Sequence, residues 1–189
     1  MGSAMRMNLD EFLQLEEQAE ATSDFWEGRI RARTPVYYRE SLIAVNLLCE
    51  LREKDQDVLG SNLLVEVTPG ELVAYADGIA LIDEPQFTDS RELVLTNPGV
   101  LFEVVSAESS EWDRGEKARH YRGCPTLRQF AFVNAETPEV EVWTRGEDGN
   151  WSAQSWQGLD TVCSLDSLNC RVPLAEIYDG VAFTGTQSG

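Results

Sequence analysis

Residues 100–106 read VLFEVVS, a run of strand-type apolar residues that only Glu103 interrupts. Residues 72–82 read LVAYADGIALI and form a second apolar run, with Asp77 near its middle. Burying an unpaired carboxylate is costly, so an acid at the centre of a strand usually has a cation, an arginine or a metal as its partner. The two runs therefore predict neighbouring core strands that carry partnered acids. The alternative for each acid is a side chain that faces water on a half-exposed strand.

Helices and further strands surround these two runs. Capping residues, a first-turn proline and apolar faces of helical spacing predict helices over residues 8–19, 34–54, 110–122 and 174–178. Apolar runs and turn residues predict strands over residues 25–33, 63–67, 127–134, 140–145 and 151–156, with 83–98 mostly loop. This order of elements predicts a mixed α/β fold, in which helices flank a central mixed β-sheet.

The length of 189 residues suits one domain, which we expect over residues 8–182. Residues 1–7 are interpreted as a cloning remnant or a disordered start, and 183–189 as a disordered tail. No apolar run approaches the roughly 18 residues of a membrane span, so we expect a cytoplasmic protein without membrane contact. Four cysteines without C-x-x-C spacing and one histidine predict reduced thiols rather than a zinc site.

Charge limits the expected partners. With 15 basic and 33 acidic residues, the chain has a net charge of −18, which opposes tight binding to nucleic acid. Residues 99–128 escape this bias, because they hold five basic and five acidic side chains. Arg29, Arg31 and Arg33 share one strand face by the period-2 rule and offer a second basic stripe, or else a solvated strand face. Any binding of nucleic acid is therefore expected to be weak and sensitive to salt.

Lys117 follows Glu103, the acid of residues 100–106, by fourteen residues. Lys117 lies on the helix predicted to open at Ser110, with Asp113 one turn before it and Tyr121 one turn after it. A strand acid, a turn and a helix lysine allow the ammonium to fold back toward the carboxylates. The alternative is an ion pair between Lys117 and Asp113 on a solvated helix face.

These residues together resemble a known family. Tyr75-Ala76-Asp77, Glu103–Ser106 and Asp113–Lys117 with Tyr121 are similar to motifs of the Uma2 (DUF820) family of putative endonucleases. That family lies within the PD-(D/E)XK, or restriction-endonuclease-like, superfamily. The resemblance extends to the opening residues 9–13, to 27–30 and to the closing segments 165–168 and 173–178.

The resemblance implies a restriction-endonuclease-like core and hydrolysis of phosphodiester bonds with Mg²⁺ (or Mn²⁺) as cofactor. By position, Asp77 and Glu103 are the implied metal ligands, the backbone carbonyl of Val104 is a possible third, and Lys117 is the catalytic cation. Nucleic acid, and DNA first, is the implied partner. A homodimer is expected because cutting both strands of a duplex takes two sites.

Further residues are assigned as substrate contacts or depart from the family pattern. The expected substrate contacts are Arg29, Arg31, Arg114 and Tyr121. Ala76 replaces a proline of the family, and Gly78 replaces a β-branched residue. Glu40 stands where the family has a histidine, as an extra acidic ligand, a general base or a solvated helix-end glutamate, and Arg29 replaces an acid. These departures and the acidic surface leave a second hypothesis, a nuclease-fold binding or assembly module with weak or no activity.

Overall fold

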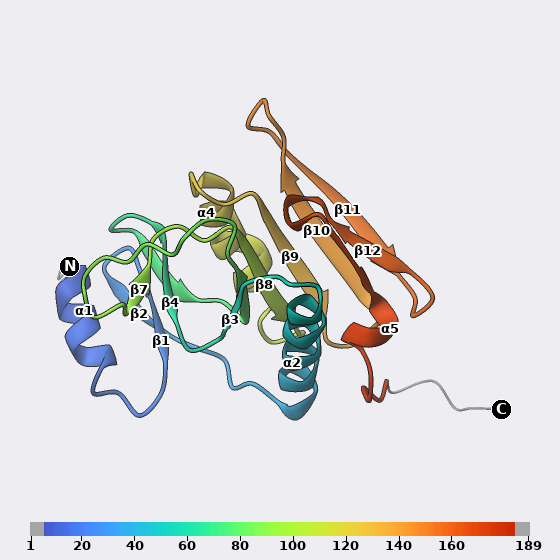
Figure 1. Cartoon of the computed structure of the whole chain (residues 1–189). Helices are drawn as coiled ribbons and strands as arrows, with labels where there is room; N and C mark the ends of the chain where they lie inside the picture. The colour runs from blue at the N-terminus through green and yellow to red at the C-terminus, as the bar shows by residue number, and fades with distance from the viewer. Residues whose placement is uncertain (1–5, 184–189) are drawn as a thin grey trace.

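The computed structural model describes residues 6–183, which form a five-stranded, a six-stranded and a two-stranded sheet with helices around them (Figure 1). The first sheet has the strand order β2-β1-β5-β4-β7. Its strands are β1 (Ser23–Trp26), β2 (Arg29–Ala32), β4 (Leu64–Thr68), β5 (Leu72–Tyr75) and β7 (Val94–Leu95). Only the β4–β7 pair is parallel, and the other pairs are antiparallel.

The second sheet has the order β11-β10-β9-β8-β6-β3. Its strands are β3 (Val58–Gly60), β6 (Gly78–Ala80), β8 (Val100–Val105), β9 (Gln129–Asn134), β10 (Glu139–Arg145) and β11 (Trp151–Gln157). Here the β8–β9 pair is parallel and the remaining pairs are antiparallel. The predicted mixed α/β fold is therefore confirmed, with two mixed sheets in place of one central sheet.

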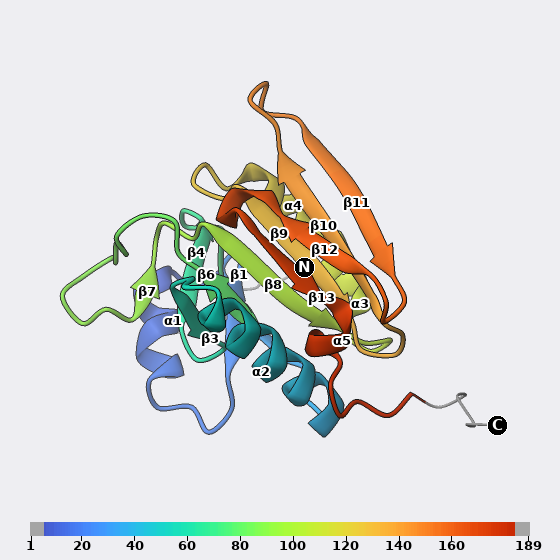
Figure 2. The ribbon, with the colours of Figure 1, turned by 45° about the vertical axis from the view of Figure 1, so that its right-hand side comes forward.

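Helices and a small hairpin cover the second sheet (Figure 2). The helical segments are α1 (Leu9–Glu16), α2 (Tyr38–Glu53), α3 (Ser110–Trp112), the π-helical turn η1 (Asp113–Lys117), α4 (Ala118–Gly123), the 3-10 turn η2 (Asp166–Leu168) and α5 (Leu174–Ile177). The hairpin of β12 (Val162–Leu165) and β13 (Cys170–Pro173) packs with α2 and α5 on one face of the second sheet. Helix α4 and the first sheet pack on the opposite face.

The apolar run 72–82 is broken where the two sheets meet. Strand β5 ends at Tyr75 and β6 begins at Gly78, so Ala76 and Asp77 join one sheet to the other. A Cβ atom at Gly78 would lie 3.0 Å from Leu48 Cδ2 of α2 and 3.4 Å from a ring atom of Phe102. A β-branched residue at this position would require Leu48 and Phe102 to shift, which favours the glycine that departs from the family pattern.

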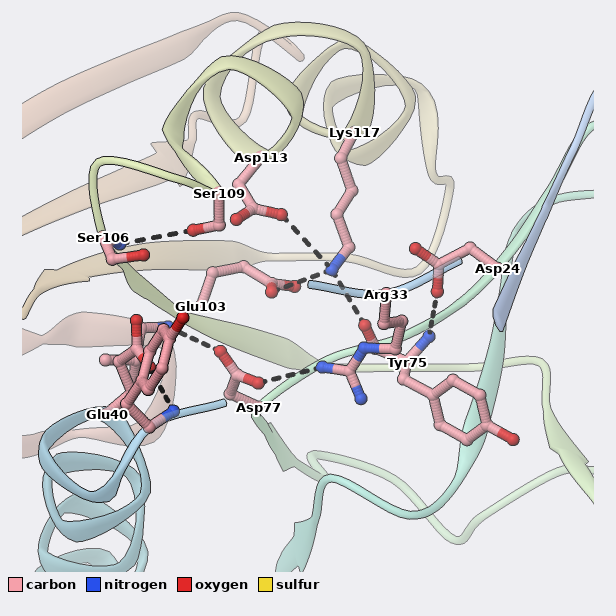
Figure 3. A network of polar contacts seen from close by, with 12 residues as sticks. Asp24, Arg33, Glu40, Tyr75, Asp77, Glu103, Ser106, Ser109, Asp113 and Lys117 are labelled. Carbon is pink, nitrogen blue, oxygen red and sulfur yellow. Dashed lines mark hydrogen bonds and ion pairs between the residues drawn. The ribbon is translucent and has the colours of Figure 1, made fainter. Parts of the chain in front are cut away.

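The predicted single strand 25–33 is wrong, because the structure has a hairpin of β1 and β2 there. Its two-residue turn holds Glu27 and Gly28 at φ angles of 48° and 80°. Positive φ at both central residues is the geometry of a turn that matches the twist of a β-hairpin. The hairpin pairs with β5 through β1. It brings Asp24 on β1 and Arg33 just after β2 close to Asp77 (Figure 3).

Two predicted helices also need correction. The helix expected from Thr34 begins at Tyr38, where Glu40 accepts a hydrogen bond of 2.6 Å from the Tyr37 N–H and so caps the first turn. The helix expected over 110–122 consists of α3, η1 and α4, because Gly115 has non-helical angles (φ −92°, ψ −105°). The short strands β3, β7, β12 and β13 were not predicted.

Residues near both ends of the described chain contact the domain. The Met7 N–H donates a 3.0 Å hydrogen bond to the Gly28 carbonyl, and the ring of Phe183 lies 5.6 Å from that of Tyr178. Residues 1–5 and 184–189 lie outside the described residues. Within the described part, no helix has both the length and the apolar character needed to cross a membrane.

We expect Gly28→Ala to destabilise the protein more than Gly149→Ala does. Both glycines have positive φ, 80° and 79°, which costs an L-residue about 1–2 kcal/mol. A Cβ at Gly28 would also lie 2.8 Å from Arg6 Cβ, whereas nothing lies within 4 Å of one at Gly149. Such an overlap adds about 1–3 kcal/mol. Denaturant unfolding of both variants measures the difference, and equal losses would show that the Gly28 turn relaxes freely.

Candidate functional site

Strand β8 aims Glu103 at the α4 side of the second sheet. Side chains of a strand alternate between its two faces, and Phe102 and Val104 pack toward α2 while Leu101 and Val105 pack toward α4. Glu103, only 2% exposed, therefore shares its face with α4. Its Oε2 atom accepts a 2.8 Å hydrogen bond from Lys117 Nζ, and its Oε1 atom accepts one from the Tyr121 hydroxyl.

Lys117 is held by several acceptors at once (Figure 3). Besides its contact with Glu103, its Nζ donates a 2.8 Å hydrogen bond to the Tyr75 carbonyl and lies 3.7 Å from Asp113 Oδ1. The side chain is 3% exposed, so the alternative of an ion pair on a solvated helix face is wrong. The strand acid and helix lysine meet as the sequence predicted.

Asp77 sits at the junction of the two sheets with both oxygens in contact with the protein. Its Oδ1 atom lies 3.1 Å from an Arg33 terminal nitrogen, and its Oδ2 atom accepts a 2.8 Å hydrogen bond from the Val104 N–H. The side chain is 16% exposed. The Val104 contact ties Asp77, which directly precedes β6, to β8 one residue after Glu103 (Figure 3).

The structure adds a buried acid that the sequence analysis missed. Asp24 on β1 is 2% exposed and accepts a 3.1 Å hydrogen bond from the Tyr75 N–H. Its signal in the sequence was the same as that of Glu103, since an acid stands inside a strand next to Phe25. The predicted strand covers residues 25–33 and begins after Asp24, so the prediction did not place this acid inside a strand.

The burial of these groups changes their pKa values. Burial raises the pKa of Glu103 from 4.5 to about 8, against the opposing charge of Lys117. Burial likewise raises the pKa of Asp24. For Lys117, burial alone would lower the pKa, but the carboxylates of Glu103, Asp113, Asp24 and Asp77 raise it above its usual value. The lysine therefore stays charged at neutral pH.

The same residues line one cleft of about 430 Å³. Of the residues predicted to form the site, the ones that line it are Asp77, Glu103, Val104, Lys117, Arg31 and Glu40. Asp24, Arg33 and Asp113 line it as well. The carboxylate of Glu40 caps α2, which agrees with a helix-end role, while its side chain remains on the wall of the cleft.

Three predicted substrate contacts are not among the residues that line the cleft. Tyr121 is 1% exposed and its hydroxyl is bound to Glu103, so it supports that acid from behind. Arg114 pairs with Glu141 and lies over the Phe132 ring at 4.6 Å. Arg29 is exposed, with its guanidinium 5.9 Å from the Trp26 ring centre. Helix phase and the β1–β2 turn decide these directions, and the sequence pattern did not resolve them.

The chemistry of the donor set fits a hard divalent cation with few protein ligands. Within residues 6–183, no three His, Cys, Asp or Glu side chains are already grouped to hold a metal ion. However, Mg²⁺ usually takes only one or two carboxylates and completes its shell with water and substrate phosphate. Four carboxyl groups line the cleft (Asp24, Asp77, Glu103 and Asp113), together with the cations Arg31, Arg33 and Lys117.

The chain is similar in sequence to a known family and to two known proteins. The model of the Uma2 family, described as "Putative restriction endonuclease", matches residues 9–175. Two proteins of the cyanobacterium Synechocystis are similar, both described as uncharacterized. The protein sll1609 is 27% identical over 145 residues (75% of this chain, 82% of the relative), and slr1290 is 26% identical over 182 residues (94% of each).

A solved structure shares the fold. The crystal structure of "a putative nuclease belonging to DUF820" from Anabaena variabilis superposes with a TM-score of 0.70 at 16% sequence identity. The match covers 91% of this chain and 97% of that one. The chain therefore shares the fold of that structure over 91% of its length.

Proposed function

Because the chain belongs to the Uma2 family, we propose that it is a divalent-metal-dependent endonuclease that hydrolyses phosphodiester bonds of nucleic acid, with DNA as the first candidate substrate. The observation that carries this proposal is the convergence of Asp77, Glu103 and Lys117 on one cleft from three separate elements. Two carboxylates and a buried lysine are not needed for a stable core, since such groups cost free energy to bury.

Asp77 and Glu103 are the residues that would hold Mg²⁺ or Mn²⁺. The Val104 carbonyl would be a third oxygen donor. Backbone groups of residues two apart in a strand point to the same edge, and Phe102 already binds the Asp77 N–H at that edge. Strand β6 begins only at Gly78, opposite Phe102, so no strand pairs with Val104 on that side within the described chain. When bound, the ion would lower the pKa of a water molecule and offset negative charge on the phosphate.

Lys117 would supply a fixed positive charge beside the reacting phosphate. Two hydrogen bonds of 2.8 Å hold its ammonium before any substrate arrives, so little reorganisation is needed when negative charge develops. Tyr121 would keep Glu103 oriented from the buried side. Arg31, half-buried on the cleft wall, would bind a phosphate of the nucleic-acid backbone.

The net charge of −18 shapes how such an enzyme would meet its substrate. Acidic residues outnumber basic ones by 33 to 15 and repel the phosphates, so we expect binding to be weak and to weaken further as salt rises. A homodimer would present two such clefts to a duplex, and this assembly is part of the proposal.

A binding or assembly module is the second candidate, and one observation favours it. All four oxygens of Asp77 and Glu103 already accept contacts from protein donors, namely Arg33, Val104, Lys117 and Tyr121. A cleft that satisfies its own acids could persist without a metal ion. The nuclease proposal requires that at least the Arg33 contact gives way to the ion.

Nuclease assays separate these two candidates. We expect the purified protein to nick supercoiled DNA, or to cleave single-stranded DNA or RNA, with Mg²⁺ or Mn²⁺ and to stop when EDTA is added. Cleavage should fall as salt is raised from 50 to about 200 mM, because phosphate contacts are replaced by counterions. No cleavage of any of these substrates with either metal would favour the binding module.

A further inference from the structure

Arg33 lines the cleft and pairs with Asp77, one of the proposed metal ligands. It follows β2 directly, and its backbone N–H donates a 3.3 Å hydrogen bond to the Thr22 carbonyl, which continues the β1–β2 hairpin. The hairpin thereby directs the side chain into the cleft, where it is 17% exposed (Figure 3). Its guanidinium carbon lies 5.3 Å from the centre of the Tyr75 ring.

Arg33 contacts one of the two carboxylate oxygens of Asp77. The other oxygen, Oδ2, accepts a 2.8 Å hydrogen bond from the Val104 N–H, a backbone donor that β8 holds in place. Oδ1 has Arg33 as its partner at 3.1 Å. A divalent ion on Oδ1 would sit against the guanidinium, and two positive charges at such close range repel each other. The ion and the arginine therefore compete for one oxygen.

The guanidinium has spare donors for another anion. Arginine has five N–H groups in a planar fork, and within residues 6–183 the one hydrogen bond that this fork makes is to Asp77 Oδ1. The fork matches the spacing of two phosphate oxygens, which is why arginine binds phosphate in a bidentate manner. Stacking against Tyr75 would support it in either position.

We propose that Arg33 holds Asp77 in the metal-free protein and transfers to the substrate phosphate when a divalent ion takes its place. The ion and the phosphate would then favour each other's binding. The ion pairs with Asp77 and frees Arg33 for the phosphate, while the phosphate pairs with Arg33 and frees Asp77 for the ion. This inference rests on the proposed nuclease function, and it assigns to Arg33 the coupling of metal binding to substrate binding.

The test is the affinity of the free protein for Mg²⁺, measured by isothermal titration calorimetry on wild type, Arg33→Gln and Arg31→Gln. Both substitutions remove one positive charge from the same cleft, but Arg31 contacts the Trp112 ring at 4.2 Å and not Asp77. We expect Arg33→Gln to bind Mg²⁺ about tenfold more tightly than Arg31→Gln. Equal affinities of the two variants would overturn the inference.

Sulfate provides the second arm, as a tetrahedral oxyanion that cannot be hydrolysed. Sodium sulfate, compared with sodium chloride at equal ionic strength, should raise the affinity of wild type for Mg²⁺ several-fold and leave that of Arg33→Gln unchanged. An equal effect of sulfate on both proteins would overturn the transfer of Arg33 to phosphate. If Arg33→Gln does not fold, as judged by circular dichroism, Arg33→Lys replaces it, with a smaller gain expected because lysine can still pair with Asp77.

Asp77→Asn shows which of the two proposals fails. If it removes Mg²⁺ binding while Arg33→Gln matches Arg31→Gln, the metal site stands and only the role of Arg33 is wrong. If wild type, Arg33→Gln and Asp77→Asn all bind no Mg²⁺, the proposed metal-dependent nuclease fails, and the inference drawn from it fails as well.

Discussion

Replacing Asp77 by asparagine is expected to lower the rate of phosphodiester cleavage at least 100-fold while the protein stays folded. Loss of a residue that only supports a metal ligand costs about 10–100-fold in affinity or activity, so loss of a ligand should cost more. Asparagine keeps the oxygen that can accept the Val104 hydrogen bond of 2.8 Å but lacks the charge that a divalent ion needs. Initial rates of plasmid nicking with Mg²⁺ measure the effect.

Asp57→Asn is the matched control for this variant. Asp57 also pairs with an arginine, Arg52, at 2.9 Å, but its side chain is exposed and lies outside the cleft. We expect its cleavage rate to equal that of wild type, and both variants to melt within a few degrees of wild type. A nuclease activity that survives in Asp77→Asn would show that the metal ion, if needed, is held elsewhere.

Replacing Lys117 by methionine is expected to destabilise the protein by about 3–5 kcal/mol at pH 8, since Glu103 loses its buried partner and must either stay ionised without one or take up a proton. The side chains of Lys117 and Glu103 are each 3% exposed, so water cannot replace the lost contact. Denaturant unfolding with EDTA present measures this loss independently of catalysis. Cleavage should be lost as well, because the fixed ammonium would be absent.

The pH dependence of this variant has a definite sign. Burial already raises the pKa of Glu103 above its value of 4.5 in the unfolded chain, and removal of the lysine raises it further. Between the value of 4.5 in the unfolded chain and the raised value in the folded variant, the folded state binds a proton that the unfolded state lacks. The stability of the variant therefore falls as pH rises through that window. Below the wild-type pKa of about 8 both folded proteins hold this proton, so the penalty of Lys117→Met should be smaller at pH 7 than at pH 9.

The double variant Lys117→Met/Glu103→Gln tests the physical cause. With both charges removed, no unpaired buried charge remains, and we expect it to be more stable than Lys117→Met alone at pH 8. If the double variant is less stable than Lys117→Met, the loss comes from packing of the lysine side chain and not from its charge. Both results are obtained without metal or nucleic acid.

Much of the fold could be predicted because local patterns and burial agree. The apolar run of β8 and its single acid were sufficient to predict a partnered Glu103, and the 14-residue spacing to Lys117 predicted the direction of the lysine. The mixed α/β class followed from the order of helices and strands. These properties depend on residues close together in sequence or on the period of an element.

The errors have the opposite origin. The Glu27-Gly28 turn, the shift of the α2 start to Tyr38 and the break at Gly115 depend on single backbone angles or on a cap, which weak propensities do not determine. The strands β3, β12 and β13 have only three or four residues each, and they owe their pairing to partners already placed by the rest of the sheet. Tertiary contacts therefore decided them.

The sequence alone determined the identity of the acids and the lysine, because a charged group inside an apolar run must find a partner wherever the chain folds. It could not determine which partners they find. Asp24 and Arg33 enter the cleft from a hairpin more than forty residues before Asp77, and Tyr121 turns inward while Arg114 turns to Glu141. Contacts between residues so far apart depend on how two sheets and a kinked helix pack, and that packing exists only in the folded molecule.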